Sequence, residues 1–308
     1  MSRASPDLSR RAFLAMLGAA SALGARFVAA APGPILKKAI PSTGEQVPVI
    51  GMGSWITFNV GEDKQLRDQR LRVLQTFFDR GGGVIDSSPM YGSSEAVIGY
   101  CLARIENTEP LFSATKVWTP LKMLGPGQMA ESRELWGIQR FDLMQIHNML
   151  NWESHLETLL ADKAAGRIRY IGMTTSHGRR HDAFEQAMAE QPLDVVQFTY
   201  NILDREAERR LLPLAAERRL AVIINRPFRQ KALIDFCKRH KLPEWASEID
   251  CANWAQFLLK FIVSHPAVTC VIPATSRVDH MRENMGALHG RLADQAMRQR
   301  MIRYVEAL

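Results

Sequence analysis

Hydrophobic and polar residues follow one another along the chain in blocks that predict a repeated strand–helix unit. From Ile50 onward, short apolar runs alternate with stretches of about twelve residues whose apolar positions lie three and four apart. One such stretch places Leu71, Leu74, Phe77 and Phe78 on a single helix face. The apolar runs predict eight strands, at residues 50–54, 83–87, 111–117, 143–147, 168–174, 195–198, 221–225 and 269–273.

The stretches after these strands predict helices that cover them. We expect these helices at residues 66–80, 94–105, 128–136, 153–165, 179–190, 205–218, 253–264 and 278–288. Strands that are apolar along nearly their whole length are typical of parallel strands covered by helices. Eight strand–helix units in one chain favour an α/β fold of the (β/α)8 barrel (TIM barrel) type over an open doubly wound sheet. An N-terminal β-hairpin (residues 35–40 and 46–49) and an additional C-terminal helix (residues 294–306) complete the predicted domain.

Glycine positions argue against the usual dinucleotide-binding fold. No Gly-x-Gly-x-x-Gly motif follows a predicted strand and opens a helix. The run of three glycines at residues 81–83 precedes a strand, so it is better explained as a turn that ends a helix.

Composition and charge describe a globular protein with a substantial core. Hydrophobic residues make up 46% and charged residues 23% of the chain. The net charge is +7, of which residues 1–30 contribute +3 (four arginines against Asp7), which leaves +4 for the rest. A remainder this small and dispersed does not indicate a nucleic-acid partner. The four cysteines, which show no close pairing and are expected to be free, buried thiols, are Cys101, Cys237, Cys251 and Cys270.

Residues 1–30 are expected to be a targeting segment, which leaves residues 31–308 as a single barrel domain. The stretch Ser9–Leu14, with Arg10 and Arg11 at its centre, resembles a twin-arginine signal and precedes an Ala- and Gly-rich apolar run. Small residues up to Ala30 suit a signal peptidase. The segment therefore predicts export by the twin-arginine machinery to the periplasm, with a disordered basic tail as the alternative. The apolar run is too short for a stable membrane span.

Four polar side chains lie at or just beyond the ends of three consecutive predicted strands. Asp86, Lys116 and His147 end these strands, and Tyr91 lies on the loop after Asp86. Because active sites of such barrels gather where the strands end, we expect the four to share one site. Each residue alone has a simpler explanation, as a turn former, a packing tyrosine, a lysine that reaches solvent or a hydrogen-bonded core histidine. Their joint occurrence favours the shared site.

This set of side chains suits the reduction of a carbonyl group. Tyr91 would donate the proton, because the neighbouring Lys116 lowers the pKa of a phenol. Asp86 would keep Lys116 charged, and His147 would hydrogen-bond the substrate carbonyl and orient it. A tyrosine cannot supply a hydride, so a nicotinamide cofactor is required. A glycoside hydrolase would need a second carboxylate near Asp86, which the sequence does not offer at a strand end.

From Val47 to its end, the sequence resembles the aldo-keto reductase family. The matching stretches are Pro48–Trp55, Asp86 with Tyr91–Glu95, Ser113–Lys116, Asp142–Asn148, Gly166–Gly172 and Val271–Ser276. The resemblance implies that Asp86, Tyr91, Lys116 and His147 form the catalytic tetrad of an NADP-dependent oxidoreductase that converts an aldehyde or ketone to an alcohol. The alternative within the same fold is a nucleotide-binding sensing or scaffold protein with little turnover.

The resemblance also implies a cofactor site, in which several positions depart from the family pattern. Gln197 matches the glutamine that holds the nicotinamide amide, whereas Thr174 and Thr175 replace Ser-Asn. Asn225 replaces the aromatic residue that stacks on the nicotinamide, and Arg226 is expected at the pyrophosphate. The cofactor residues implied in full are Gly53, Ser54, Thr174, Thr175, Gln197, Asn225, Arg226, Pro227, Phe228, Thr275, Ser276, Arg277, Glu283 and Asn284.

A few residues bear on the choice between NADPH and NADH and on contacts with the substrate. Ala274 replaces the family's lysine for the 2′-phosphate, and Arg277 is expected to supply that charge, which favours NADPH over NADH. Trp55 and Trp118 follow strand ends and are predicted to line the substrate pocket. His177 and His181 have a spacing that can bind a metal, but no third ligand accompanies them, so no metal site is expected.

Overall fold

Eight parallel strands form a closed barrel in the computed structural model, which describes residues 33–308. The predicted targeting segment lies outside this range. Neighbouring strands pair in chain order, and isolated bridges from Ile50 to Val271 and from Gly53 to Ala274 join the first strand to the last. The strands are β3 (Met52–Gly53), β4 (Val84–Asp86), β5 (Phe112–Val117), β6 (Phe141–Ile146), β7 (Ile168–Thr174), β8 (Val195–Thr199), β9 (Ala221–Asn225) and β10 (Cys270–Val271). The (β/α)8 prediction is confirmed.

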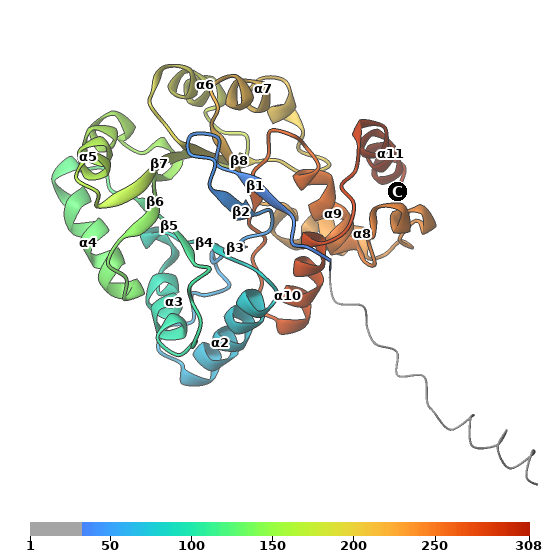
Figure 1. Cartoon of the computed structure of the whole chain (residues 1–308), viewed down its shortest axis with the longest axis horizontal. Helices are drawn as coiled ribbons and strands as arrows, with labels where there is room; N and C mark the ends of the chain where they lie inside the picture. Colours follow the sequence, from blue (N-terminus) through green and yellow to red (C-terminus); the bar gives the residue numbers. More distant parts are fainter. Residues whose placement is uncertain (1–32) are drawn as a thin grey trace, which may run out of the picture. The chain divides into compact units, whose positions relative to one another are not determined.

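Helices surround the strands, as Figure 1 shows. Those that follow barrel strands are α2 (Lys64–Asp79), α3 (Ser94–Leu102), α4 (Gly125–Trp136), α5 (Trp152–Ala164), α6 (His181–Glu190), α7 (Leu211–Glu217), α9 (Trp254–Val263) and α10 (Val278–Met285). The C-terminal helix α11 (Gln295–Glu306) forms as predicted, and Asp294 caps it by accepting a hydrogen bond from the backbone of Met297. Each of these nine helices therefore overlaps a range in which the sequence predicts a helix.

Two segments between β8 and β10 differ from the sequence prediction. The single helix expected at residues 205–218 is divided into η5 (Glu206–Glu208) and α7. Pro213 explains the break, because proline lacks an N–H and is tolerated only in the first turn of a helix, where α7 places it. The short helices α8 (Ala232–Cys237) and η7 (Glu244–Ile249) lie in a stretch for which no helix was predicted.

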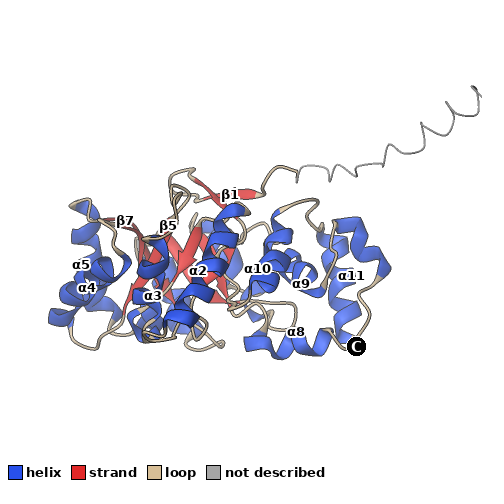
Figure 2. Ribbon diagram, turned by 90° about the horizontal axis from the view of Figure 1, so that it is seen from below, coloured by secondary structure: helices blue, strands red, loops and turns tan. Residues whose placement is uncertain are grey.

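The core has an inner and an outer part. Phe112 and Tyr170 stack inside the barrel with ring centroids 5.8 Å apart. Ile40 and Val47, from the hairpin of β1 (Lys37–Ala39) and β2 (Gln46–Pro48), join this inner cluster. Figure 2 shows β1 at one end of the strands. The hairpin thus closes the barrel with apolar side chains at the end where the strands begin, and leaves the other end for a site.

The cysteines and the lengths of the helices are two further properties of the described residues. All four cysteines are free and buried, as expected, and burial raises the pKa of the Cys101 thiol to about 12. Within residues 33–308, no helix has the length and apolar character needed to cross a membrane.

Arg298 fastens α11 to the barrel. Its guanidinium donates to the Tyr200 hydroxyl, to Glu208 Oε1 at 2.7 Å and to the Phe261 carbonyl at 3.4 Å. The arginine is 9% exposed. These charged hydrogen bonds reach three other segments of the chain, so they link the C-terminal helix to the residue after β8, to η5 and to α9.

Replacing Arg298 with methionine should therefore lower the free energy of unfolding by about 1.5–3 kcal/mol. The side-chain volume is kept, whereas Tyr200 and Glu208 lose their buried partner. Urea unfolding followed by circular dichroism would measure the change. Arg300→Met on the same helix is the control, because Arg300 pairs with Glu248 at the surface (43% and 53% exposed side chains) and should contribute at most about 1 kcal/mol. Equal losses in the two variants would contradict the role of Arg298.

Candidate active site

The ends of β4, β5 and β6 bring the predicted catalytic side chains together. Asp86 is the last residue of β4, Lys116 lies near the end of β5, and His147 follows β6 directly. Tyr91 ends the short helix η2 (Pro89–Tyr91), which begins where the Ser88 side chain accepts a hydrogen bond from Met90 N. Gly92 then turns the chain with a φ of +59°, and a Cβ there would lie 2.5 Å from Asn59 Oδ1, so only glycine fits.

Asp86 and Lys116 form a buried ion pair. Lys116 Nζ lies 2.6 Å from Asp86 Oδ2 and donates to the Ser87 carbonyl at 2.7 Å, and the two side chains are 1% and 3% exposed. The other carboxylate oxygen, Oδ1, accepts from the side-chain amides of Gln145 and Gln197, both at 2.9 Å. Burial is the largest single influence and opposes the lysine charge, but the attraction and hydrogen bond of Asp86, together with Tyr91 and Glu95, outweigh it, so the pKa of Lys116 is raised. Lys116 therefore stays charged.

Gln145 is a site residue that the sequence interpretation missed. Leu143 and Gln145 lie two positions apart in β6, and His147 follows two positions later, directly after the strand. The three side chains therefore point to the same side, into the barrel. Gln145 Oε1 also accepts from Gln197 Nε2 at 3.1 Å. A polar residue that alternates with buried ones in an apolar strand was the available signal.

Tyr91 lies over this ion pair. Lys116 Nζ is 5.2 Å from the centre of its ring, and the ring meets His147 edge-on with centroids 5.6 Å apart. Burial raises the pKa of the Tyr91 phenol, and the charge of Lys116 offsets this only in part. The net direction is opposite to the one expected from Lys116 alone. At neutral pH Tyr91 consequently keeps its proton, as a proton donor must.

His147 is buried and neutral. Burial, together with the charge of Lys116, lowers its pKa to about 2. Its Nδ1 lies 2.8 Å from Ser88 Oγ, and this hydroxyl already accepts from Met90 N, so its own proton is available to Nδ1. That arrangement leaves the imidazole proton on Nε2, which has no hydrogen-bond partner among residues 33–308. Nε2–H is therefore free to donate to a bound molecule.

The lowered pKa of His147 predicts a pH dependence of stability. As the pH falls through 6.5, the unfolded chain gains a proton at His147, whereas the folded protein does not until about pH 2. Stability should therefore be fully present above pH 6.5 and decrease below it, by up to about 1.4 kcal/mol per pH unit. Urea unfolding at pH 4.5, 5.5 and 6.5 should give a shallower decrease for His147→Gln than for the wild type. Identical slopes would contradict this assignment.

The residues implied for a cofactor differ in what their polar groups contact. Gln197 directs its amide to Asp86 rather than outward, and Ser54 Oγ donates to Ser87 Oγ at 2.8 Å and to the Asp86 carbonyl at 3.1 Å. Asn225 Nδ2 donates to the Thr175 carbonyl at 3.0 Å. These side chains therefore form a hydrogen-bonded floor between the strand ends.

Other implied residues lie at the end of β7 and on or beside α10. Thr174 Oγ1 accepts from Asn148 N at 2.9 Å, at the end of β7. Arg277 is exposed and pairs with Asp279, with Nη2 2.5 Å from Oδ2. Glu283 lies 4.0 Å from Lys238, and Asn284 is buried in α10. The expectation that Arg277 serves a phosphate therefore requires it to leave Asp279.

A basic hollow of about 490 Å³ opens beside this floor, at the ends of β7, β8 and β9. Arg226 lines it, is half-buried, and its side chain has no hydrogen-bond or ion-pair partner within the described part of the chain. Arg229 also lines it and pairs with Asp204. His177 and His181 lie here too, but residues 33–308 contain no group of three His, Cys, Asp or Glu placed to hold a metal ion. The unpaired arginine suits an anion.

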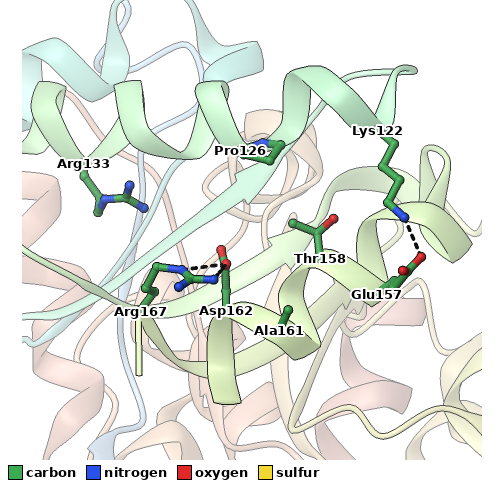
Figure 3. Close-up of a pocket in the computed structure, with 8 residues that line it drawn as sticks. All are labelled: Lys122, Pro126, Arg133, Glu157, Thr158, Ala161, Asp162 and Arg167. Atoms are coloured by element: carbon green, nitrogen blue, oxygen red, sulfur yellow. Dashed lines mark hydrogen bonds and ion pairs between the residues drawn. The ribbon is translucent and has the colours of Figure 1, made fainter. Parts of the chain in front are cut away.

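A second hollow, of about 500 Å³, lies outside the barrel between α4 and α5. Figure 3 shows Lys122 paired with Glu157 and Arg167 paired with Asp162, with Arg133 apart on α4. None of the tetrad residues lines it. Its charges are largely balanced, so it carries no chemistry for this site.

The barrel gathers a carboxylate, a lysine, a tyrosine and a neutral histidine at one mouth, a set of groups suited to an enzyme that uses acid–base chemistry. A profile of the aldo/keto reductase family matches residues 49–301. The chain belongs to the aldo/keto reductase family, whose members are oxidoreductases.

Individual relatives agree with this family. Aldo-keto reductase YhdN of Bacillus subtilis is 27% identical over 203 residues, which span 60% of this chain and 60% of that protein. The NADH-specific methylglyoxal reductase of Escherichia coli is 24% identical over 309 residues, or 80% of this chain and 91% of that one. An aldo/keto reductase from Klebsiella pneumoniae, solved with NADP and acetate, superposes with a TM-score of 0.74 at 23% identity over 88% of this chain and 96% of its own.

Proposed function

We propose that this protein is an NAD(P)H-dependent reductase that converts an aldehyde or ketone to an alcohol, with Tyr91 as the proton donor. The observation that carries the proposal is the buried Lys116–Asp86 pair under the Tyr91 ring, beside a neutral His147. His147 Nε2–H donates to the carbonyl oxygen and orients it. Tyr91 then transfers its proton to that oxygen as negative charge develops there. Lys116 stabilises the resulting tyrosinate, and Asp86 keeps Lys116 in place.

The chain's own residues fit a nicotinamide nucleotide. Arg226 offers an unpaired cation in the basic hollow, which suits a phosphate group. Thr174, Thr175 and Asn225 provide polar groups on the floor between that hollow and Tyr91. When bound, the nucleotide would supply the hydride that these side chains cannot. The Klebsiella structure with NADP and the NADH-specific Escherichia enzyme support both nucleotides as candidates.

We expect the protein to bind NADPH more tightly than NADH, because Arg277 can turn from Asp279 to a 2′-phosphate. Titration of each nucleotide by protein fluorescence would measure the two Kd values. Arg277→Ala should narrow the difference between them, and Asp279→Ala, which releases Arg277, should widen it. Equal Kd values in the wild type would contradict this role of Arg277.

The same titration, followed by assay with a panel of aldehydes and quinones, tests the proposed function. Turnover of any carbonyl supports a reductase. Binding of a nucleotide without turnover would favour the sensing or scaffold role, and binding of neither nucleotide would exclude the reductase.

We further propose that residues 1–30 direct export to the periplasm through the twin-arginine machinery. The support is the Arg10-Arg11 pair before an apolar run. That route carries folded proteins, so a nucleotide could be loaded before export to a compartment where free nucleotides are scarce. Cell fractionation of the wild type and of a variant with Arg10→Lys and Arg11→Lys would test it, and an unchanged distribution would reject it.

A further inference from the structure

Apolar and charged side chains occupy opposite sides of the barrel mouth. Large hydrophobic side chains are exposed on the loops that follow β3, β4 and β5, and these residues are Ile56, Met90, Trp118, Leu121, Met123 and Leu124. The loops after β7, β8 and β9 instead carry the basic hollow with Arg226 and Arg229. The reacting groups Tyr91 and His147 lie on loops after β4 and β6. One side of the mouth therefore suits an anion, and the other side suits an apolar molecule.

The apolar side is centred on residues 118–124, which we call the β5 ledge. Its exposure is high, with Met123 at 81%, Leu124 at 53% and Leu121 at 52%. Isolated exposed hydrophobic residues are common on protein surfaces, but a cluster on one loop indicates a binding surface. The ledge contains few other groups that could recognise a ligand, since its charged residue Lys122 is paired with Glu157.

Side chains from two neighbouring elements hold the backbone of the ledge. Gln128 on α4 accepts from Trp118 N at 2.6 Å and donates to Trp118 O at 2.9 Å. His155 Nε2 lies 2.8 Å from the Thr119 carbonyl, and Asn151 Nδ2 donates to the Pro120 carbonyl at 3.1 Å. Three consecutive residues are thus fixed by side chains. Because these hydrogen bonds already hold the backbone of residues 118–120, that part of the loop needs no further ordering when a molecule binds.

The ledge continues directly from the reaction centre. Lys116 points into the barrel under Tyr91, and side chains alternate along a strand, so Trp118 emerges on the same side two residues later. A molecule whose carbonyl meets Tyr91 and His147 therefore has exposed apolar side chains on the two loops that follow Asp86 and Lys116, namely Met90 beside Tyr91, and Trp118 with the rest of the ledge.

We propose that the β5 ledge binds the non-reacting part of the substrate, and that the substrate is a bulky, apolar aldehyde or ketone rather than a small polar dicarbonyl. This inference rests on the proposed function. Each methylene that the ledge covers should raise kcat/KM by about fourfold until the ledge is filled. Side chains on the ledge, rather than the tetrad, then determine which carbonyl compound is preferred.

The test is a series of straight-chain aldehydes from propanal to decanal, with methylglyoxal for comparison. In the wild type, kcat/KM should rise with chain length and methylglyoxal should be a poor substrate. Met123→Ser and Leu121→Ser should each flatten the rise; both residues are exposed, so folding should be retained. Leu160→Ser on α5 is the matched control, because Leu160 is 39% exposed but lies late in the helix that leads away from the mouth. Its slope should equal that of the wild type.

The outcomes separate this inference from the function on which it rests. Turnover without any dependence on chain length would overturn the inference and keep the reductase. If no aldehyde is reduced, calorimetric binding of octanamide against acetamide decides: tighter octanamide binding that Met123→Ser weakens would support the ledge, and equal binding would overturn it. A change in oligomeric state by sedimentation in Met123→Ser, with an unchanged slope, would show that a second copy of the chain covers the ledge and would also overturn the inference.

Discussion

Replacing Tyr91 with phenylalanine is expected to lower kcat for carbonyl reduction by about 10²–10⁴-fold, the range found for loss of a general acid. The substitution removes only the phenol oxygen. The ring keeps its edge-on contact with His147 and its position over Lys116. Nucleotide binding and stability should therefore change little, so that the loss falls on the chemical step.

Steady-state assays with a reactive aldehyde, combined with fluorescence titration of the nucleotide, would measure both quantities. Tyr100→Phe is the matched control, because this tyrosine lies on the outer helix α3, where its hydroxyl donates to Asp68 at 2.6 Å. The Tyr100→Phe variant should keep the activity of the wild type. Tyr91→Phe with kcat within a few-fold of the wild type would mean that another group or water delivers the proton.

Replacing Lys116 with methionine should remove both activity and stability. The carboxylate of Asp86 would remain buried without its cation, and breaking a buried ion pair in this way costs about 3–5 kcal/mol. The same change removes the charge that stabilises the tyrosinate of Tyr91. Urea unfolding would report the stability, and turnover at a temperature where the variant is folded would report the activity.

A second substitution separates these two effects. Adding Asp86→Asn to Lys116→Met removes the unpaired charge, so part of the lost stability should return while activity stays low. Lys241→Met serves as the surface control, because Lys241 and Glu244 are 82% and 88% exposed and their pair should contribute little. If the double variant were no more stable than Lys116→Met, the buried charge would not be the cause of the loss.

The barrel and the gathering of Asp86, Tyr91, Lys116 and His147 at one mouth could be predicted because their signals are local. Apolar strands and amphipathic helices recur along the chain, and Asp86, Lys116 and His147 stand at the ends of successive strands. The break near Pro213 also has a local signal, because proline is unfavourable in a helix interior, although we predicted one continuous helix there. Helix α8 is only six residues long, too short for periodicity to indicate it.

The hydrogen bonds that surround the Lys116–Asp86 pair could not be predicted, because they join residues that are distant in the sequence. Gln197 lies 111 positions from Asp86 and donates to it, a contact that the family resemblance, which implies a nicotinamide contact for this glutamine, did not indicate. Ser54, also assigned to the cofactor, donates inward to Asp86 and Ser87. Which way a polar side chain points at a strand end is decided by neighbours across the barrel, and a single sequence does not specify them.

The apolar hairpin at the other end of the barrel also constrains how each catalytic cycle ends. Ile40 and Val47 pack against the start of the strands, so the described part of the chain provides no polar path from that end to Tyr91. Under the proposed mechanism, the proton that Tyr91 gives up must return from solvent through the mouth by which the alcohol departs. Reprotonation of Tyr91 and departure of the alcohol therefore use the same opening.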